Sequence, residues 1–281
     1  MLPDVIDLLR CPHCGDRLEL GEGAARCAAG HSFDVARQGY LNLLPGDART
    51  GSADTAAMVR ARAAFLDAGH YTPIADAVAS AADEVVGAGE GAVVDLGAGT
   101  GYYLAAVLDR LTAARGLALD ISKHALRVAA RAHPRIGAVG CDAWVGLPVR
   151  DTAAALAINV FAPRDPAELA RVLAPGGALV VVTPNPGHLR ELVSAVGMLT
   201  VQERKRERLT GKLGALFEHV AETAVERPLM LDHDDLAVLV AMGPSARHLD
   251  EREIEQRVTA LADPLAVTLS VTVATYRNAT S

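Results

Sequence analysis

Mainly apolar runs of strand length alternate with helix-like segments through the middle of the chain. The runs lie at residues 93–96, 116–119, 136–139, 153–160 and 178–183. After the first run, Leu104, Val107, Leu108 and Leu111 recur at helical spacing. Strands that alternate with helices predict a parallel sheet, whose ligands bind beyond the carboxyl ends of its strands. Towards the end of the chain, residues 235–240 resemble a helix, and residues 265–276 alternate between apolar and polar side chains, which predicts a further strand.

A glycine-rich loop follows the first predicted strand. Asp95 is followed by Gly97, Gly99 and Gly101, and glycine allows a sharp turn and a close approach of the backbone to a ligand. The dinucleotide-binding fingerprint needs a glycine three residues after Gly99, where this chain has Tyr102. The D-x-G-x-G-x-G pattern instead resembles the first motif of class I S-adenosylmethionine-dependent methyltransferases. That resemblance implies a Rossmann-like α/β fold and S-adenosylmethionine as cofactor, bound at Asp95, Gly97, Gly99, Thr100 and Gly101.

Acidic residues end the next two predicted strands. Asp120 stands where an acid accepts hydrogen bonds from both ribose hydroxyls of a nucleoside. Asp142, followed by Ala143, is placed to accept a hydrogen bond from the adenine amino group. Glycines that serve only a tight turn would not need these acids, so we predict a cofactor site at this edge of the sheet. In the class I methyltransferase fold the last strand inserts antiparallel into the sheet, and residues 265–276 are placed for that position.

Cysteine spacing near the start of the chain predicts a metal site. Cys11 and Cys14 are two residues apart, and Cys27 and His31 follow after a gap of twelve. Four such ligands close a tetrahedral site, so we expect a structural Zn²⁺ that holds a ribbon of roughly 36 residues together. Redox use of Cys11 and Cys14 would leave the other two ligands unexplained, and we expect His13 to be a bystander.

Composition and charge limit the classes of function. No apolar stretch approaches the length of a membrane span, and the N-terminal residues do not resemble a signal peptide, so we expect a cytoplasmic protein that does not act at a membrane. The net charge is −7, which provides no overall attraction to nucleic acid. A basic run at residues 203–208, with Lys212, and a looser group of Arg49, Arg60 and Arg62 would serve either as an RNA contact or as a solvated face.

Longer motifs resemble the RlmA family. They are the zinc knuckles, residues 33–44, 61–71, 95–101, 159–163 and 183–189. The family methylates a guanine at N1 in a hairpin loop of bacterial 23S rRNA. Residues 159–164 look closest to the branch with the tylosin-resistance methyltransferases of macrolide-producing actinobacteria. The resemblance places zinc on Cys11, Cys14, Cys27 and His31, and the methyl donor against Tyr71, Gly99, Thr100 and His188, and it implies a homodimer that clasps the RNA.

Guanine N1 carries a proton at neutral pH, so the reaction needs a base or groups that stabilise negative charge on O6. Asp165, Asp142 and His70 are candidate bases. Arg164 is a candidate for stabilising O6, and Asn159 for holding the base edge.

The sequence therefore predicts three parts. Residues 1–36 form the zinc ribbon, residues 37–90 a helical linker and cap, and residues 91–281 the methyltransferase domain, in which residues 197–230 are a cap or dimer element. Two other functions remain open at this point: methylation of a small molecule or a protein, and non-enzymatic sensing of S-adenosylmethionine.

Overall fold

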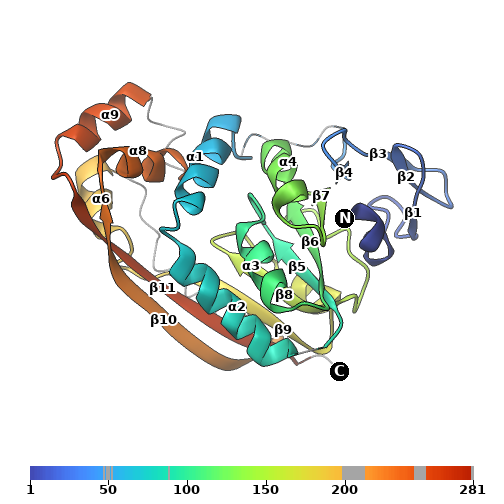
Figure 1. The fold of residues 1–281 in the computed structure, drawn as a ribbon. Helices are drawn as coiled ribbons and strands as arrows, with labels where there is room; N and C mark the ends of the chain where they lie inside the picture. Colours follow the sequence, from blue (N-terminus) through green and yellow to red (C-terminus); the bar gives the residue numbers. More distant parts are fainter. Residues whose placement is uncertain are drawn as a thin grey trace.

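The fold is known from a computed structural model. It describes residues 1–46, 48, 51, 53–87, 89–197, 213–243 and 251–279. In these ranges the chain forms a small three-stranded sheet and a large eight-stranded one, with helices packed on the large sheet (Figure 1).

The elements follow one another in a regular order. The small sheet consists of β1 (Leu18–Leu20), β2 (Ala24–Cys27) and β3 (Ser32–Asp34), preceded by two short helices, η1 (Leu2–Asp4) and η2 (Ile6–Leu8). The strands of the large sheet are β4 (Tyr40–Asn42), β5 (Ala92–Leu96), β6 (Arg115–Asp120), β7 (Ile136–Gly140), β8 (Ala154–Val160), β9 (Leu173–Pro184), β10 (Phe217–Leu231) and β11 (Leu265–Asn278). The helices are α1 (Ala56–Asp67), α2 (Thr72–Val86), α3 (Tyr102–Arg110), α4 (Lys123–Ala132), α5 (Pro166–Val172), α6 (Arg190–Leu192), η4 (Val193–Gly197), α8 (His233–Ala241) and α9 (Glu251–Thr259).

The large sheet has the strand order β10-β11-β9-β8-β5-β6-β7-β4. The strands from β4 to β9 pair in parallel, as the alternation of strands and helices predicts. The last strand, β11, lies antiparallel between β9 and β10, which confirms the position expected for it. The glycine loop follows β5 at the centre of the sheet, with Asp120 at the end of the neighbouring strand β6.

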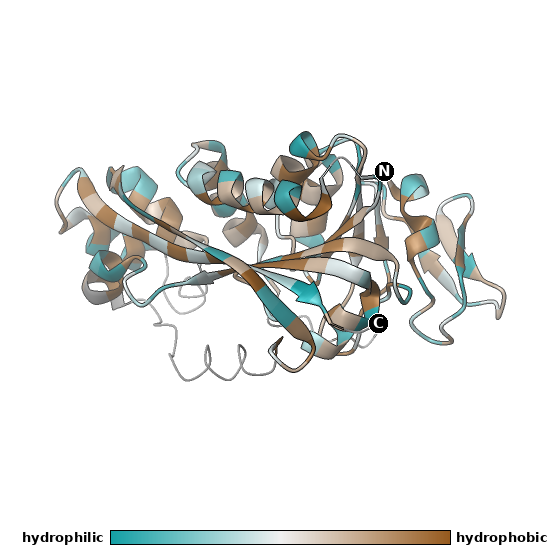
Figure 2. Cartoon of the chain, turned by 90° about the horizontal axis from the view of Figure 1, so that it is seen from below, coloured by the Kyte–Doolittle hydropathy of each residue, from teal (hydrophilic) through white to brown (hydrophobic). Residues whose placement is uncertain are grey.

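Each face of the large sheet carries its own apolar core. Helices α2, α3 and α4 cover one face, where Ile74, Leu104 and Leu126 are buried against the strands. The other face packs on α5 and on the N-terminal segment, from which Val5 and Leu9 are fully buried. Figure 2 shows hydrophobic stretches along the strands as well as on the helices. Burial on both faces explains why the parallel strands are nearly continuous apolar runs.

Three segments differ from the elements that the sequence predicts. Residues 40–42, expected in a helical linker, form a strand that pairs in parallel with β7 at the sheet edge. Residues 175–177, where one proline and two glycines predict a turn, form an irregularity within β9. Residues 198–212 of the segment 197–230, which we expected as a cap or dimer element, lie outside the described residues, but residues 217–230 belong to the edge strand β10. A strand of three residues is too short to produce a recognisable pattern.

The N-terminal segment is fastened to the large sheet by polar contacts as well. Arg115, the first residue of β6, donates two hydrogen bonds of 2.7 Å to the carboxylate of Asp7. The backbone N–H of Arg10 also donates to the carbonyl oxygen of Pro148. None of the helices in the described part of the chain has the length and apolar character needed to span a bilayer.

Candidate functional site

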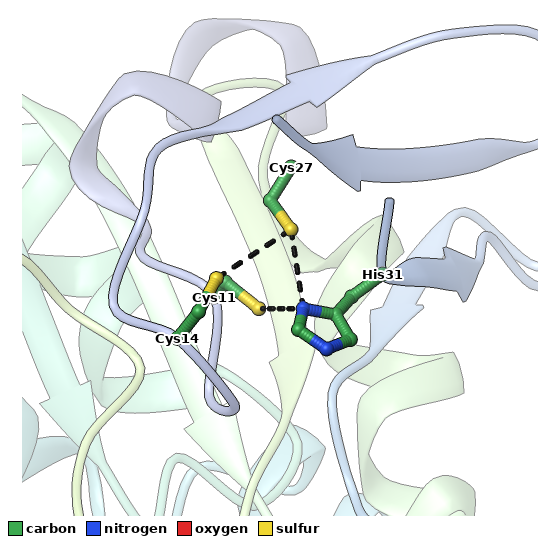
Figure 3. A group of neighbouring side chains, drawn as sticks. All are labelled: Cys11, Cys14, Cys27 and His31. Carbon is green, nitrogen blue, oxygen red and sulfur yellow. Dashed lines mark hydrogen bonds between the residues drawn. The ribbon is translucent and has the colours of Figure 1, made fainter. Parts of the chain in front are cut away.

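Four potential zinc ligands lie together beside the small sheet. Cys11 and Cys14 come from the loop before β1, Cys27 ends β2, and His31 precedes β3 (Figure 3). Their ligand atoms all lie within 4.8 Å of one another. The Cys14–Cys27 Sγ distance is 3.6 Å, and His31 Nδ1 lies 3.5 Å from Cys11 Sγ and 3.3 Å from Cys27 Sγ. Tetrahedral Zn–S bonds of about 2.3 Å separate two sulfurs by about 3.8 Å, so the group fits zinc.

The neighbouring His13 is not one of these four residues. Its ring stacks on Phe33 with a centroid separation of 5.7 Å. Zn²⁺ held by three thiolates and one imidazole has no open coordination position, so its role is structural.

The glycine loop lies at the carboxyl end of β5 and has a left-handed backbone at all three glycines. Their φ angles are +75° at Gly97, +55° at Gly99 and +79° at Gly101. A Cβ on Gly97 would lie 2.4 Å from the Cβ of Ala162, so this glycine lets the loop after β8 pack against the loop after β5. A Cβ on Gly99 would lie 3.3 Å from Nη1 of Arg62, which places an arginine of α1 over the loop.

Asp120 connects the glycine loop to the next helix. Its carboxylate accepts hydrogen bonds of 2.8 Å from the backbone N–H groups of Gly99 and Ser122. Burial raises the pKa of Asp120, and these two hydrogen bonds oppose the rise. Ser122, a residue type favoured at helix N-caps, caps α4 by accepting a hydrogen bond from the N–H of Ala125. The carboxylate of Asp120 is thus held at the strand end where a ribose-binding acid is expected.

The other residues predicted to bind the methyl donor lie in the glycine loop or at the carboxyl ends of β5 and β7. Thr100 is buried within the loop, and Asp142 and Ala143 follow β7, where Asp142 accepts a 3.0 Å hydrogen bond from the N–H of Trp144. Asp95 is only 1% exposed, and burial together with the charge of Asp120 raises its pKa well above the usual range. Its Oδ2 has no hydrogen-bond partner among the described residues. An unpaired buried carboxylate oxygen beside the loop suits a ligand with an ammonium group.

Tyr71 and His188 meet although 117 residues separate them in the chain. Tyr71 precedes α2 and His188 follows β9, and Tyr71 Oη lies 3.5 Å from His188 Nε2. His188 Nδ1 accepts a hydrogen bond from the N–H of Ser270, so the neutral ring carries its proton on Nε2. Burial lowers the pKa of His188 to about 4, which keeps the ring neutral at pH 7. The ring of Phe161 stacks on this imidazole.

The three predicted catalytic residues, one near the end of β8 and two in the loop after it, make contacts within the protein. Asn159 is fully buried: its Nδ2 donates to the carbonyl oxygens of Leu96 and Pro163, and its Oδ1 accepts from Arg164. Arg164 is itself buried, and burial lowers the pKa of its guanidinium. Asp165 is exposed and caps α5 by accepting from the N–H of Ala167. The polar groups named here have partners within the protein, whereas Nε of Arg164 is buried without a hydrogen-bond partner among the described residues. Catalytic roles for the three residues stay predictions.

Two other candidates from the sequence are His70 and the basic run. His70, a candidate base, is paired with Asp235 of α8 at 3.0 Å. The basic run at residues 203–208, like Arg49 and Lys212, lies outside the described residues.

Sequence reasoning missed the part that α1 plays at the loop. Arg62 forms an ion pair with Asp54 and donates a 3.0 Å hydrogen bond to the carbonyl oxygen of Met242, after α8. Ser122 Oγ donates to the carbonyl oxygen of Asp54. These contacts hold the segment before α1 against the edge of the large sheet where the methyl donor is predicted to bind, called the donor edge below. The motif quoted around Arg62 contained the residue, but its helical spacing gave no sign that the side chain reaches Gly99.

Comparisons with known proteins agree with this arrangement. Residues 9–51 match the family described as "RlmA, N-terminal", and residues 93–177 match the family described as "Methyltransferase domain". A 23S rRNA (guanine(748)-N(1))-methyltransferase from Streptomyces fradiae is 50% identical over 97% of both chains. A putative 23S rRNA (guanine-N(1)-)-methyltransferase from Micromonospora griseorubida is 49% identical over 99% of both chains. The chain belongs to the RlmA family.

Solved structures resemble the RlmA-family chain in fold alone. The [4+2]-cyclase SpnF has a TM-score of 0.50 and 19% identity, and the similarity covers 74% of this chain and 82% of that one. The YcgJ protein from Bacillus subtilis has a TM-score of 0.50 and 14% identity, with coverage of 73% and 98%. The class I methyltransferase fold and the zinc ribbon expected from the sequence are both confirmed.

Proposed function

We propose that this protein methylates N1 of a guanine in 23S rRNA with S-adenosylmethionine as methyl donor. The observation that carries the proposal is the 50% identity, over 97% of both chains, to a 23S rRNA guanine-N1-methyltransferase. Identity across nearly the whole length includes the zinc ribbon as well as the donor edge. A small-molecule or protein methyltransferase would share the donor edge but would not need this similarity over the ribbon.

The chain offers a polar group for each end of the donor. The unpaired Oδ2 of Asp95 suits the ammonium of its methionine part, and Asp120 suits its ribose. Asp142 and Ala143 follow the neighbouring strand and would hold the adenine. S-adenosylmethionine, when bound, supplies a methyl group on a positively charged sulfur, and transfer to N1 leaves S-adenosylhomocysteine and releases the N1 proton.

The proton on N1 requires a group that accepts it. His188 is an unsuitable base, because its Nδ1 already accepts from Ser270 and its Nε2 carries the proton. Asp165 is exposed after β8 and is the carboxylate that we propose as base. The backbone and side-chain contacts of Asn159 and Arg164 then hold the loop that carries it.

Four finer statements belong to the proposal. The target guanine lies unpaired in a hairpin loop, because pairing would shield N1. The protein acts as a homodimer, acts in the cytoplasm where rRNA is made, and protects its host from macrolides of the tylosin type. The resemblance of the sequence motifs to the RlmA family supports these statements, and each is open to separate measurement.

Methyl transfer to unmodified 23S rRNA tests the function. Wild-type protein and the variant Asp120→Ala are incubated with labelled S-adenosylmethionine and rRNA, both naked and in ribosomal particles. Primer extension then locates the product, because N1-methylguanine blocks base pairing. We expect a stop beside one guanine of a hairpin loop with the wild type and a much weaker stop with the variant. Donor binding without any RNA labelling would instead favour a small-molecule methyltransferase.

A further inference from the structure

Phe161 is an exposed aromatic residue at the donor edge. All ten aromatic residues of the chain are described, and only Phe161 and Trp144 among them have exposed side chains. Phe161 follows the last residue of β8 and is 42% exposed. Its ring is therefore open to contact from a ligand beside the predicted donor site.

The backbone at Phe161 is strained. Its φ is +55°, a left-handed conformation that bulky residues rarely adopt. Only three non-glycine residues in the described ranges have a positive φ. One is Phe161, and another is Leu189, which directly follows the contacting residue His188. Strain of this kind persists where the surrounding structure imposes it, and it clusters at ligand sites.

The neighbouring loops impose this conformation. Asn159 donates to the carbonyl oxygens of Leu96 and Pro163, which fixes both ends of the turn around Phe161. The missing side chain of Gly97 admits Ala162, the next residue. The ring is therefore held outward by a buried polar side chain and a close backbone approach, and not by burial of the ring itself.

Phe161 stacks on a ring that is also fixed. The centroids of Phe161 and His188 are 5.9 Å apart and their planes differ by 20°. Tyr71 completes the group, with its ring centroid 6.4 Å from that of Phe161. Ser270 holds His188 from behind through its backbone N–H. A fixed, partly exposed aromatic ring next to the predicted donor residues is a surface on which a planar ligand can stack.

We propose that Phe161 is the platform on which the target guanine stacks while N1 is methylated. This inference rests on the proposed function. The lone pair that attacks from N1, once its proton has left, lies in the plane of the base. The donor must then approach the edge of the base, which leaves the face of the base free to stack on Phe161. Asn159, which we expected to hold the base edge, is buried, and Phe161 replaces it as the substrate-positioning residue of this loop.

Phe161→Gly and Phe161→Tyr form a matched pair of variants. Glycine removes the ring and relieves the left-handed strain, so the melting temperature should stay the same or rise. Donor affinity should change by less than about threefold, because donor contacts are assigned to other residues. Loss of one base–aromatic stack corresponds to about a 5- to 150-fold loss, and we expect single-turnover methylation of rRNA to fall within that range. Tyr retains the ring and should retain methylation.

The affinity for RNA distinguishes stacking on the target base from a purely structural role of Phe161. Wild type and Phe161→Gly are each compared on the hairpin with its target guanosine and on the same hairpin with an abasic nucleotide there. The wild type should bind the abasic hairpin more weakly, whereas the glycine variant should bind both with similar affinity. Equal losses in both proteins would overturn the proposal, as would a glycine variant that methylates at the wild-type rate or loses donor affinity tenfold. If the glycine variant does not fold, Phe161→Leu gives the same comparison. Failure of the wild type to methylate rRNA would refute the proposed function itself.

Discussion

Replacing Gly97 by Ala should damage both stability and activity, for reasons that a second glycine separates. Gly97 combines a φ of +75° with a contact in which an added Cβ would lie 2.4 Å from the Cβ of Ala162. Gly176 has a similar φ of +71°, but an added Cβ there would meet nothing within 4 Å. Gly176 also lies near the amino end of β9, away from the donor edge. Gly176→Ala therefore reports the cost of the backbone conformation alone.

The structure allows both costs to be approximated. A left-handed backbone costs an alanine about 1–2 kcal/mol, and the less flexible unfolded chain offsets about 0.4–1 kcal/mol of this. Gly176→Ala should thus lower the free energy of unfolding by about 1 kcal/mol. Gly97→Ala adds overpacking of about 1–3 kcal/mol, because a Cβ of Ala162 can move only with its backbone.

Urea unfolding of both variants, with zinc present and donor absent, measures these differences. We expect Gly97→Ala to be less stable than Gly176→Ala by at least about 1 kcal/mol. Because Ala162 follows Phe161, Gly97→Ala should also slow methylation of rRNA, while Gly176→Ala should not. Equal stability of the two variants would show that the loop after β8 yields freely, and the close approach of the two loops would then have no energetic importance.

Three further results are expected. Chelation of zinc, or Cys27→Ala, should unfold the ribbon and make it sensitive to protease, because metal binding by the four ligands supplies much of the free energy that folds so small a module. Protease resistance of the metal-free protein would contradict this. Because burial lowers the pKa of His188 to about 4, the free energy of unfolding should fall by up to about 3 kcal/mol as the pH falls from about 6.5 to 4. In urea titrations at several pH values, His188→Gln should show a weaker dependence on pH than the wild type, and an equal dependence would refute the assignment. Asp120→Asn should weaken donor binding by about tenfold in calorimetry, because its amide faces two N–H groups with only one acceptor oxygen; unchanged affinity would remove Asp120 from the donor site.

The sequence predicted those parts of the molecule that depend on local patterns. The strands buried on both faces are continuous apolar runs, and the positions of β5, β6, β7 and β8 followed from them. The zinc ligands were identified because a tetrahedral site formed by two short knuckles needs only local spacing. The acid at the end of β6 was found because it directly follows an apolar run, and the carboxyl ends of neighbouring parallel strands lie at the same edge of the sheet.

The remaining parts depend on contacts between distant residues. The direction of the Asn159 side chain is set by the carbonyl oxygen of Leu96, which lies 63 residues earlier. The exposure of Phe161 depends on the contact between Ala162 and Gly97, and the position of Arg62 on its contact with Met242. Residue types alone did not distinguish an amide that faces the substrate from one that supports a loop.

The short strand β4 limits how this protein can be divided or recombined. Its residues 40–42 follow the zinc ribbon directly and form the edge of the large sheet beside β7, while Val5 and Leu9 fill a core on one face of that sheet. A gene fragment that ended after the last zinc ligand would encode a ribbon without its docking strand. The remaining fragment would encode a sheet with an open edge and an uncovered apolar face, both of which promote aggregation. The zinc ribbon, β4 and the large sheet therefore have to stay together in any fragment of this protein, and in any chimera made with a relative.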